Sequence, residues 1–367
     1  MIGKHFSSSD RLLSLDAFRG ITIAGMLLVN NSGYYTYEQL DHAYWNGLTF
    51  ADIIAPFFIW IIGVAMVFSL NKRLEQGIDR KTLLLQILRR SVFLFVIGIV
   101  LYNFPSYDLS SIRVTGVLQR IAICYLIGGS IYLYTKFKGQ AIWIVGLVLG
   151  YWLVITYLPV PGVGMGTLEK ENNIAGYVDS LLLKGHLFTS HWDPDGILST
   201  VSSVATVLFG VITGQLLMSK NSQTQKTIIV FLGGIGLCCA GLILNNWVPI
   251  NKTLWTGSFV FFTAGLALMI FSVFYFLIDV RKHKKWFTPL VIYGVNPIII
   301  YFLSTIFTKL LFIIPFHGLI LREFIYFNFY SVLTTPKNAS LLFALTHLLL
   351  FYLVAYGMYK RKWYLKI

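Results

Sequence analysis

The sequence predicts an all-α polytopic membrane protein with about ten transmembrane helices, and three observations lead to this fold class. Of its 367 residues, 56% are hydrophobic and only 12% are charged. The mean hydropathy of +0.72 lies far from that of a soluble globular protein. Long apolar segments recur along the whole chain, with short basic clusters between them. No large soluble domain remains, and we expect one integral-membrane domain over residues 1–367.

The apolar segments predict the helices in order, because a membrane-spanning helix needs about 20 mostly apolar residues. The first segment is too long for a signal peptide and has no small-residue cleavage site after it, so we interpret it as a membrane helix. The ten predicted helices cover residues 17–36, 52–70, 87–104, 117–135, 141–158, 197–218, 227–247, 257–278, 288–312 and 340–359.

The basic residues predict the orientation, because Lys and Arg next to spanning helices are retained on the cytoplasmic side. With both chain ends inside, 21 of the 29 Lys and Arg residues lie in cytoplasmic segments, and the long segment 160–196 becomes an external loop region. The net charge of +14 would also suit a nucleic-acid partner. The clusters are short and next to the membrane, so we attribute them to topology and anionic lipid, and expect no nucleic acid. The inside groups are Lys4, Arg11 and Arg19, then residues 71–90, 136–138, 220–226, 281–285 and 360–366.

The three cysteines, Cys124, Cys238 and Cys239, all fall within predicted helices. Two adjacent cysteines have the wrong geometry for an ordinary disulfide. No spacing of His and Cys residues in the chain matches a zinc site. We therefore expect packing roles for the cysteines, no disulfide and no metal.

The stretch "LDHAYWNGLTFADIIAPFF" at 40–58 brings polar residues to the threshold of the second helix, where such groups are usually functional. A neutral imidazole at His42 can accept a proton from an attacking amine or hydroxyl, or can itself attack an activated acyl group. Asp41 or Asp52 would orient the ring, and Asn30 would donate a hydrogen bond to an oxyanion. Two structural interpretations stay open: a single loop histidine often only faces solvent, and Asp52 is well placed to cap the helix.

The segment 160–196 contains two more histidines, five acidic residues and several aromatic residues. Carboxylates beside aromatic faces suit a sugar-binding groove, in which a carboxylate bonds to hydroxyls or an amine and a ring stacks on the sugar. External loops are often polar and aromatic residues are common at membrane interfaces, so an ordinary loop stays an alternative. The substrate-binding candidates are Asp41, Trp45, Asn46, Asp193 and Asp195, and the reserve catalytic candidates are His186 and His191.

Two stretches that we expect on the cytoplasmic side carry arginines, "SLDAFRG" at 14–20 and "RVTGVLQRIAICY" at 113–125. An arginine inside a span costs a few kcal/mol unless it is paired or faces an aqueous cavity. Arg19, Gln119 and Arg120 are therefore candidates for binding a phosphate or carboxylate. A structural pair between Arg120 and a buried Asp is an equally good interpretation.

Seven stretches resemble the heparan-alpha-glucosaminide N-acetyltransferase family and occur in the family's order. The block around His42 is the most specific of them, whereas the apolar spans between the motifs would match many membrane proteins. The stretches are "SLDAFRGITIAGMLLVNN", "HAYWNGLTFADIIAPFFIWIIGV", "RVTGVLQRIAICY", "LPVPG", "AGYVDSLLL", "DPDGILST" and "VPINKTLW".

The resemblance implies acetyl transfer across a membrane, from cytosolic acetyl-CoA to a terminal glucosamine on the other side. The family's active-site histidine matches His42 in "HAYWNG", and its asparagine near the acetyl group matches Asn30. We expect the chain to lack the extra amino-terminal region of the lysosomal enzyme, and its segment "NSGYYTYEQLD" differs from that enzyme in residue type and length. We therefore expect a compact, bacterial-type member in the inner membrane, with its catalytic loop outside. Its expected partners are an amino sugar or glycan acceptor and membrane lipid, with a homodimer as a candidate assembly.

Three functions remain open at this point. The first is N-acetylation of an amino sugar or glycan, in which the thin pantetheine arm of CoA reaches up between the helices while its phosphates stay with the arginines. The second is O-acetylation of an envelope polysaccharide, which is the same chemistry with a hydroxyl acceptor. The third is a transporter or lipid-linked glycan flippase, although the two halves of the chain show no convincing repeat.

Overall fold

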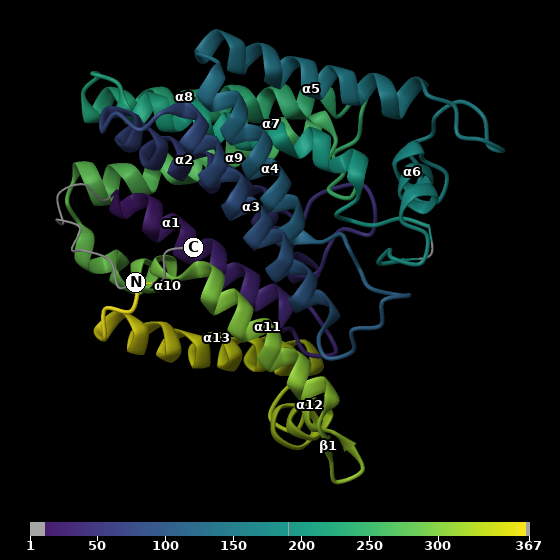
Figure 1. Ribbon diagram of the computed structural model, residues 1–367. Coiled ribbons are helices and arrows are strands. Elements are labelled where there is room, and N and C mark those ends of the chain that lie inside the picture. Colours follow the sequence, from purple (N-terminus) through teal and green to yellow (C-terminus); the bar gives the residue numbers. More distant parts are fainter. Residues whose placement is uncertain (1–11, 190, 365–367) are drawn as a thin grey trace.

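The computed structural model describes residues 12–189 and 191–364 and is almost entirely helical (Figure 1). Among these residues, nine helices are long and apolar enough to cross a membrane, and one bent helix pair raises the number to ten. The predicted fold class is confirmed. Lys4, Arg11 and Lys366, which the charge argument places inside, lie outside the described residues.

The unbroken helices begin and end within a few residues of most predicted ranges. The second begins earlier than predicted, after a capping box formed by Thr49 and Asp52, and it also continues beyond residue 70 to Glu75. It ends just before Gly77, which has a φ of +81°. The nine helices are α1 (Leu13–Asn30), α2 (Phe50–Glu75), α3 (Arg80–Asn103), α4 (Val117–Tyr134), α5 (Phe137–Tyr157), α7 (Ile197–Met218), α8 (Gln223–Leu244), α9 (Gly257–Tyr275, continued by a π-helical turn at Phe276–Val280) and α13 (Pro336–Lys360).

The sequence predicted one continuous helix over 288–312, and this prediction is wrong. The structure has α10 (Thr288–Val295) and α11 (Pro297–Ile313), which are bent by 67° relative to each other. Pro297 has no backbone N–H to donate, and the residue before a proline is driven out of the helical region. Asn296 accordingly has φ −126° and ψ 53°.

Several short elements were not predicted. The external segment 160–196 contains α6 (Ile174–Leu182), whose first turn is capped by the Asn173 side chain, a 2.8 Å acceptor for Gly176 N. Other short elements lie between or before the long helices: the 3₁₀ turns Glu38–Leu40 and Lys284–Phe287, the antiparallel pair β1 (Pro315–Phe316) and β2 (Leu319–Ile320), α12 (Leu321–Ile325) and a π-helical turn at Tyr326–Tyr330.

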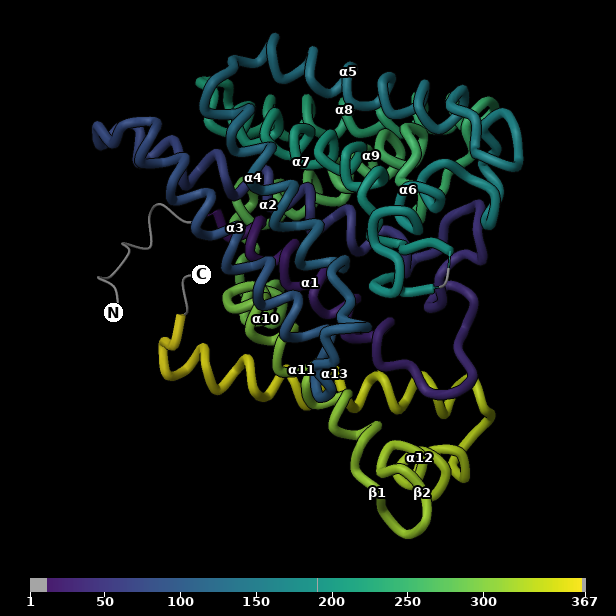
Figure 2. Tube along the Cα trace, turned by 45° about the vertical axis from the view of Figure 1, so that its right-hand side comes forward, coloured from purple at the N-terminus to yellow at the C-terminus, as the bar shows by residue number. Residues whose placement is uncertain are grey.

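Glycines allow the central helices to pack with their backbones in contact, as is common in membrane bundles. A Cβ atom on Gly63 of α2 would lie 2.1 Å from the carbonyl oxygen of Val207 in α7. A Cβ on Gly20 of α1 would lie 1.7 Å from Leu290 O in α10. Figures 1 and 2 show α5 and α13 on opposite sides of this central group. The helices α2 and α7 are therefore mostly buried, whereas α3, α5, α8 and α13 expose apolar side chains.

The connections between the long helices gather at two ends of the bundle. One end, here called the His42 end, carries the loops 31–49, 104–116, 158–196 and 245–256. The other, the Arg19 end, carries the short connections between α2 and α3, α4 and α5, α7 and α8, and α9 and α10. Helix α1 begins and α13 ends at the Arg19 end, on the left in Figure 1.

Candidate functional site

The carboxylate of Asp52 joins the start of α2 to His42. Its Oδ2 accepts hydrogen bonds from Thr49 N and Ala43 N, each at 3.1 Å, and its Oδ1 lies 2.9 Å from His42 Nδ1. Asp52 is buried, whereas the side chain of His42 is 50% exposed. The structural role expected for Asp52, capping the helix, is confirmed by the capping box. The other oxygen of the same group holds the histidine ring.

Lys252 is a third member of this group, and no feature of the sequence singled it out as a site candidate. Its Nζ lies 2.9 Å from His42 Nδ1, 3.3 Å from His42 Nε2 and 3.4 Å from Asp52 Oδ1. Burial lowers the pKa of Lys252, although the carboxylates of Asp52 and Asp195 act to raise it. The stretch "VPINKTLW" marked this segment, but nothing in it indicates contact with His42, 210 residues away.

The predicted substrate residues Trp45 and Asn46 hold loops of the His42 end together. The Asn251 amide donates to Trp45 O at 2.9 Å and to Asn46 Oδ1 at 3.1 Å. The Trp45 indole donates to Leu168 O at 2.7 Å, and its ring meets that of Trp192 edge to face at 6.0 Å. These contacts connect the loop that carries His42 to two neighbouring loops. A substrate role for Trp45 or Asn46 stays a prediction.

Asp193 and Asp195 are engaged by arginines. Arg113 makes two hydrogen bonds to Asp193, at 2.8 and 3.0 Å, and Arg120 Nε lies 3.5 Å from Asp195 Oδ1. Burial raises the pKa of Asp193, but the hydrogen bonds and charge of Arg113 outweigh it and lower the pKa. The structure therefore gives both carboxylates partners within the protein. Their role in substrate binding stays a prediction.

The sequence predicted Arg19 and Arg120 on the same side, but the structure places them at opposite ends of the bundle. Arg120 pairs with Asp195, donates to Pro194 O at 3.0 Å and covers the Trp255 ring at 4.6 Å, all at the His42 end. The alternative interpretation, a structural pair with an aspartate, describes these contacts.

The two other predicted amide residues, Asn30 and Gln119, differ in their surroundings. Asn30 is exposed at the end of α1, while its neighbour Asn31 is buried and donates to Leu27 O at 2.7 Å. Gln119 is 2% exposed, and neither polar atom of its amide has a hydrogen-bond partner among the described residues.

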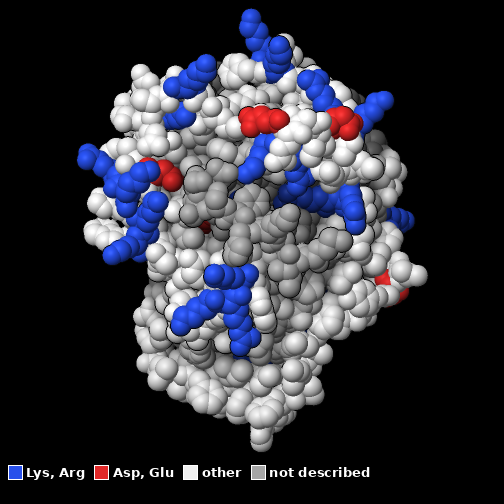
Figure 3. Space-filling view, turned by 60° about the vertical axis from the view of Figure 1, so that its left-hand side comes forward, with Lys and Arg blue, Asp and Glu red and all other residues white. Residues whose placement is uncertain are grey.

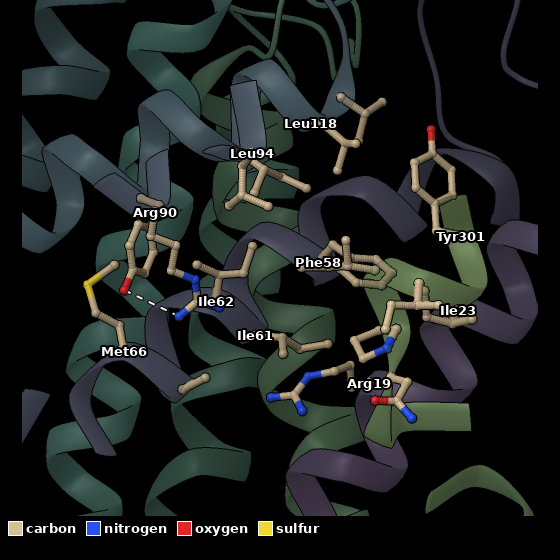
Figure 4. A pocket seen from close by; sticks show the side chains of 18 of the residues that line it. Arg19, Ile23, Phe58, Ile61, Ile62, Met66, Arg90, Leu94, Leu118 and Tyr301 are labelled. Atoms are coloured by element: carbon tan, nitrogen blue, oxygen red, sulfur yellow. Dashed lines mark hydrogen bonds between the residues drawn. The ribbon is translucent and has the colours of Figure 1, made fainter. Parts of the chain in front are cut away.

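A cavity of about 410 Å³ lies between α1, α2, α3, α4 and the α10–α11 break. Figure 4 shows Arg19 and Arg90 toward one end of it and Leu118 and Tyr301 toward the other, with apolar side chains such as Phe58 between them. The lining residues of α2 extend from Arg73 to Ala55, or about 27 Å at 1.5 Å per residue. That is nearly the thickness of a bilayer's hydrocarbon core, about 30 Å.

The cavity ends next to the His42 group. On α2, Asp52 lies three residues before Ala55, the lining residue nearest to the His42 end, and on α1, Asn30 lies four residues beyond the lining residue Met26. Residues three or four apart share one face of a helix. Asn30 and Asp52 therefore each stand one turn beyond the end of the cavity.

The three arginines of the cavity come from different helices, and only Arg19 was predicted from the sequence as a binding candidate. Arg19 pairs with Asp16 at 3.0 Å. Arg90 donates to Tyr125 Oη at 3.4 Å and lies 4.8 Å from the centre of that ring, and Arg73 donates to Gln86. Figure 3 shows further groups of Lys and Arg on the face that includes this end. No local pattern predicts that arginines this far apart in sequence line one cavity.

The cysteines have no partners of their own kind in the described structure: Cys124 is buried, Cys238 is partly buried and Cys239 is exposed. No cluster of three or more His, Cys, Asp or Glu side chains suited to a metal ion occurs within residues 12–189 and 191–364.

Comparison with known proteins places these residues in a family. A family model described as "Heparan-alpha-glucosaminide N-acetyltransferase, catalytic" matches residues 11–173, which include His42 and Asp52. Heparan-alpha-glucosaminide N-acetyltransferase of Homo sapiens is 32% identical over 351 residues, 79% of this chain and 52% of the relative. The protein of that name from Mus musculus is 31% identical over 353 residues, 80% and 53% of the two chains. The chain thus spans about half the length of the curated relatives it matches. It belongs to the heparan-alpha-glucosaminide N-acetyltransferase family.

Proposed function

We propose that the chain is a transmembrane N-acetyltransferase that moves an acetyl group from acetyl-CoA at the Arg19 end to the amino group of a glucosamine-type sugar or glycan at the His42 end. The observation that carries this proposal is the cavity, which extends from three arginines to within one helical turn of Asp52 and Asn30. The family membership supports the chemistry, because the named relatives are N-acetyltransferases that act on a glucosaminide.

The charges along the cavity suit the donor. Guanidinium groups bind phosphates well, and the cavity provides Arg19, Arg73 and Arg90 at one end. The middle is lined mainly by Ile, Phe, Leu and Met side chains, which would exclude the charged nucleotide. A thin uncharged arm carrying an acetyl group would fit there. In this arrangement the charged nucleotide of CoA stays at the Arg19 end, and only the acetyl group crosses the membrane.

The polar groups at the far end suit acetyl transfer. With Nδ1 bound to Asp52, Nε2 of His42, which has Lys252 Nζ at 3.3 Å, would take the proton of the acceptor amine while the amine nitrogen attacks the acetyl carbon and the CoA thiolate leaves. The same nitrogen can instead attack the acetyl carbon first and carry the group to the amine. In either route, Asn30 is the candidate donor to the carbonyl oxygen.

The exposed surface next to His42 suits a sugar. Tyr44 is 85% exposed, and the Lys170 ammonium lies 3.9 Å from the centre of its ring. Asp41 is exposed and places Oδ1 2.8 Å from His42 N, where it remains open to a second donor. We assign acceptor binding to this surface, with Tyr44 stacking on the sugar and Asp41 bonding to its amine or hydroxyls. Asp193 and Asp195 contribute less to acceptor binding because they are paired with Arg113 and Arg120.

Acetyl transfer by the purified protein, with labelled acetyl-CoA and glucosamine, tests the proposal. Replacing His42 with Ala should preserve the fold and acetyl-CoA binding but reduce transfer at least about a hundredfold, since the loss of a general base typically has this effect. His317→Ala is the matched control, because His317 is exposed in the turn between β1 and β2. Near-normal turnover by His42→Ala would contradict the proposal and turn attention to Asp52, His186 and His191.

The same assay separates the remaining functions. A transporter gives no acetylated product, and an O-acetyltransferase gives product with hydroxyl acceptors but none at the glucosamine nitrogen. Incubation without an acceptor separates the two roles of His42. A labelled protein that forms with the wild type and not with His42→Ala indicates a nucleophile, and no label indicates a base.

A further inference from the structure

Lys252 approaches His42 in a way that an ordinary hydrogen bond does not explain. Its Nζ lies 2.9 Å from Nδ1 and 3.3 Å from Nε2, so it is close to both nitrogens of one ring. The lone pair or proton of each nitrogen lies in the ring plane, and the two point in diverging directions. A group in that plane and close to both nitrogens would collide with the carbon between them. The ammonium group therefore lies against the face of the imidazole.

This position fixes which ring nitrogen is available. Asp52 Oδ1 lies 2.9 Å from Nδ1, and as a carboxylate it can only accept. Nδ1 therefore carries the proton, and Nε2 carries the lone pair, an assignment that follows from the hydrogen bonds. The Lys252 ammonium group then neither accepts a proton from the ring nor donates an in-plane hydrogen bond to one of its nitrogens. Its effect on the ring is electrostatic.

The loop that carries Lys252 is rigidly built. Asn251 is fully buried, and its side chain accepts from Leu254 N at 2.8 Å while its amide binds the loop of His42. Gly47 N donates to Ile250 O at 2.8 Å, which joins the same two loops. Trp255 is buried with a φ of +50°, an uncommon conformation for a large residue. These contacts on both sides of Lys252 hold its backbone at a set distance from His42.

Two charges of opposite sign therefore act on the ring. Asp52 favours a positive imidazolium, and Lys252 opposes it at a similar distance. The other charged groups that act on Lys252 are Asp195, which supports its positive charge, and Arg120, which opposes it. We infer that Lys252 is a positioning residue for His42: its ammonium group offsets the charge of Asp52 and keeps Nε2 unprotonated and available to the acetyl group. The role of Lys252 in acetyl transfer rests on the proposed function. The effect of its charge on the His42 ring does not depend on that function.

The protonation of His42 can be measured without any acetyl transfer. Diethyl pyrocarbonate acylates neutral imidazole, and mass spectrometry of the peptides gives the rate for each histidine as a function of pH. When Lys252 is replaced by Met, the carboxylates of Asp52 and of the neighbouring Asp41 act on the ring without an opposing charge, so His42 should stay protonated to higher pH. We expect the midpoint of its reaction to rise by about one pH unit, the lower end of the range for a nearby charge. Lys252→Arg keeps the charge and should leave the midpoint near that of the wild type.

Two controls and one activity measurement complete the test. Lys184→Met removes an exposed lysine from the same end of the bundle and should change nothing, and His317 in each variant provides an internal reference. The acidic limb of kcat/KM for acetyl transfer should move with the His42 midpoint. If Lys252 is only a structural partner of Asp52, Lys252→Met lowers the unfolding temperature and leaves the midpoint unchanged, which overturns the inference. A shifted midpoint in a protein that transfers no acetyl would support the role of Lys252 and contradict the proposed function.

Discussion

At the scale of single residues, the site depends on one carboxylate with two tasks. Asp52 uses Oδ2 to bind the first turn of α2 and Oδ1 to bind His42, so the group that starts the helix also fixes the ring. Because α2 is largely buried, the ring is held by a packed helix as well as by its own loop. The helix cap and the orientation of the His42 ring therefore both depend on one carboxylate group.

The arginines of the cavity permit a comparison within one helix. Arg90 lines the cavity, whereas its neighbour Arg89 is exposed and does not. If Arg90 binds a phosphate of CoA, Arg90→Ala should weaken acetyl-CoA binding by about 1.5–3 kcal/mol, the range for hydrogen bonds to charged groups. Arg19→Ala should have an effect of the same order. Equilibrium binding of labelled acetyl-CoA measures this, and an equal effect of Arg89→Ala would contradict a specific phosphate site.

The sequence could predict some site residues and not others, for a physical reason. His42 and Asp52 are ten positions apart at the edge of an apolar segment, so their association is a local feature. The contact with Lys252 and the pair of Arg113 with Asp193 depend on how the loops of the His42 end pack together. The burial of these side chains and their partners depend on the fold, so no local sequence pattern predicts them.

At the scale of elements, the start of α7 depends on a buried carboxyl from α6. The first N–H groups of a helix have no partner within it. Asp179 supplies one, because its Oδ1 accepts from Ile197 N at 2.8 Å. Burial raises the pKa of this carboxyl to about 6, and the charge of Asp193 adds to the effect. Only glycine fits at 196, where a Cβ atom would collide with this carboxyl group.

The raised pKa of Asp179 predicts a pH dependence of stability. Between about pH 4 and 6 the folded protein holds a proton that the unfolded chain has released, so stability falls as the pH rises through this window and stays lower above it. A difference of about two units corresponds to about 3 kcal/mol. Asp179→Asn keeps an acceptor oxygen but carries no charge. Its unfolding temperature relative to wild type should therefore be higher at pH 7.5 than at pH 4.5.

Thermal unfolding of detergent-purified protein at the two pH values measures this difference. Glu171→Gln, at an exposed position in the same segment, is the control and should show little pH-dependent change. A relative unfolding temperature for Asp179→Asn that is the same at both pH values would show that the buried carboxyl causes no loss of stability.

Two prolines show why the break in the tenth span could not be predicted. Pro56 lies inside α2, which continues to Glu75, whereas Pro297 separates α10 from α11. Both stand in apolar segments, so composition does not distinguish them. The difference is in the surroundings: Asn296 and Pro297 line the cavity, and irregular backbone within a membrane is tolerated where it lines a cavity.

At the scale of the whole molecule, the order and approximate length of the helices follow from the apolar segments, because length and hydropathy alone determine which segments can span a membrane. The cavity does not follow from them. It forms where α1, α2, α3, α4 and the α10–α11 break meet. Because α1 and α2 run in opposite directions, Arg19 near the start of α1 and Arg73 near the end of α2 lie at the same end of it. A path for a group across the bundle is therefore a property of the assembled helices.

The proposed path requires the His42 end and the Arg19 end to face opposite sides of the membrane. Gln76, after α2, and Met165, in the segment before α6, are both exposed, and they lie at the Arg19 end and the His42 end respectively. In a variant with all three native cysteines replaced by alanine, Gln76→Cys and Met165→Cys each provide one thiol. An impermeant maleimide added to intact cells should label Met165→Cys, and Gln76→Cys should react only after the membrane is opened. The basic clusters at the Arg19 end favour this orientation. Labelling of both positions from one side would contradict the spanning arrangement and, with it, acetyl transfer through the bundle.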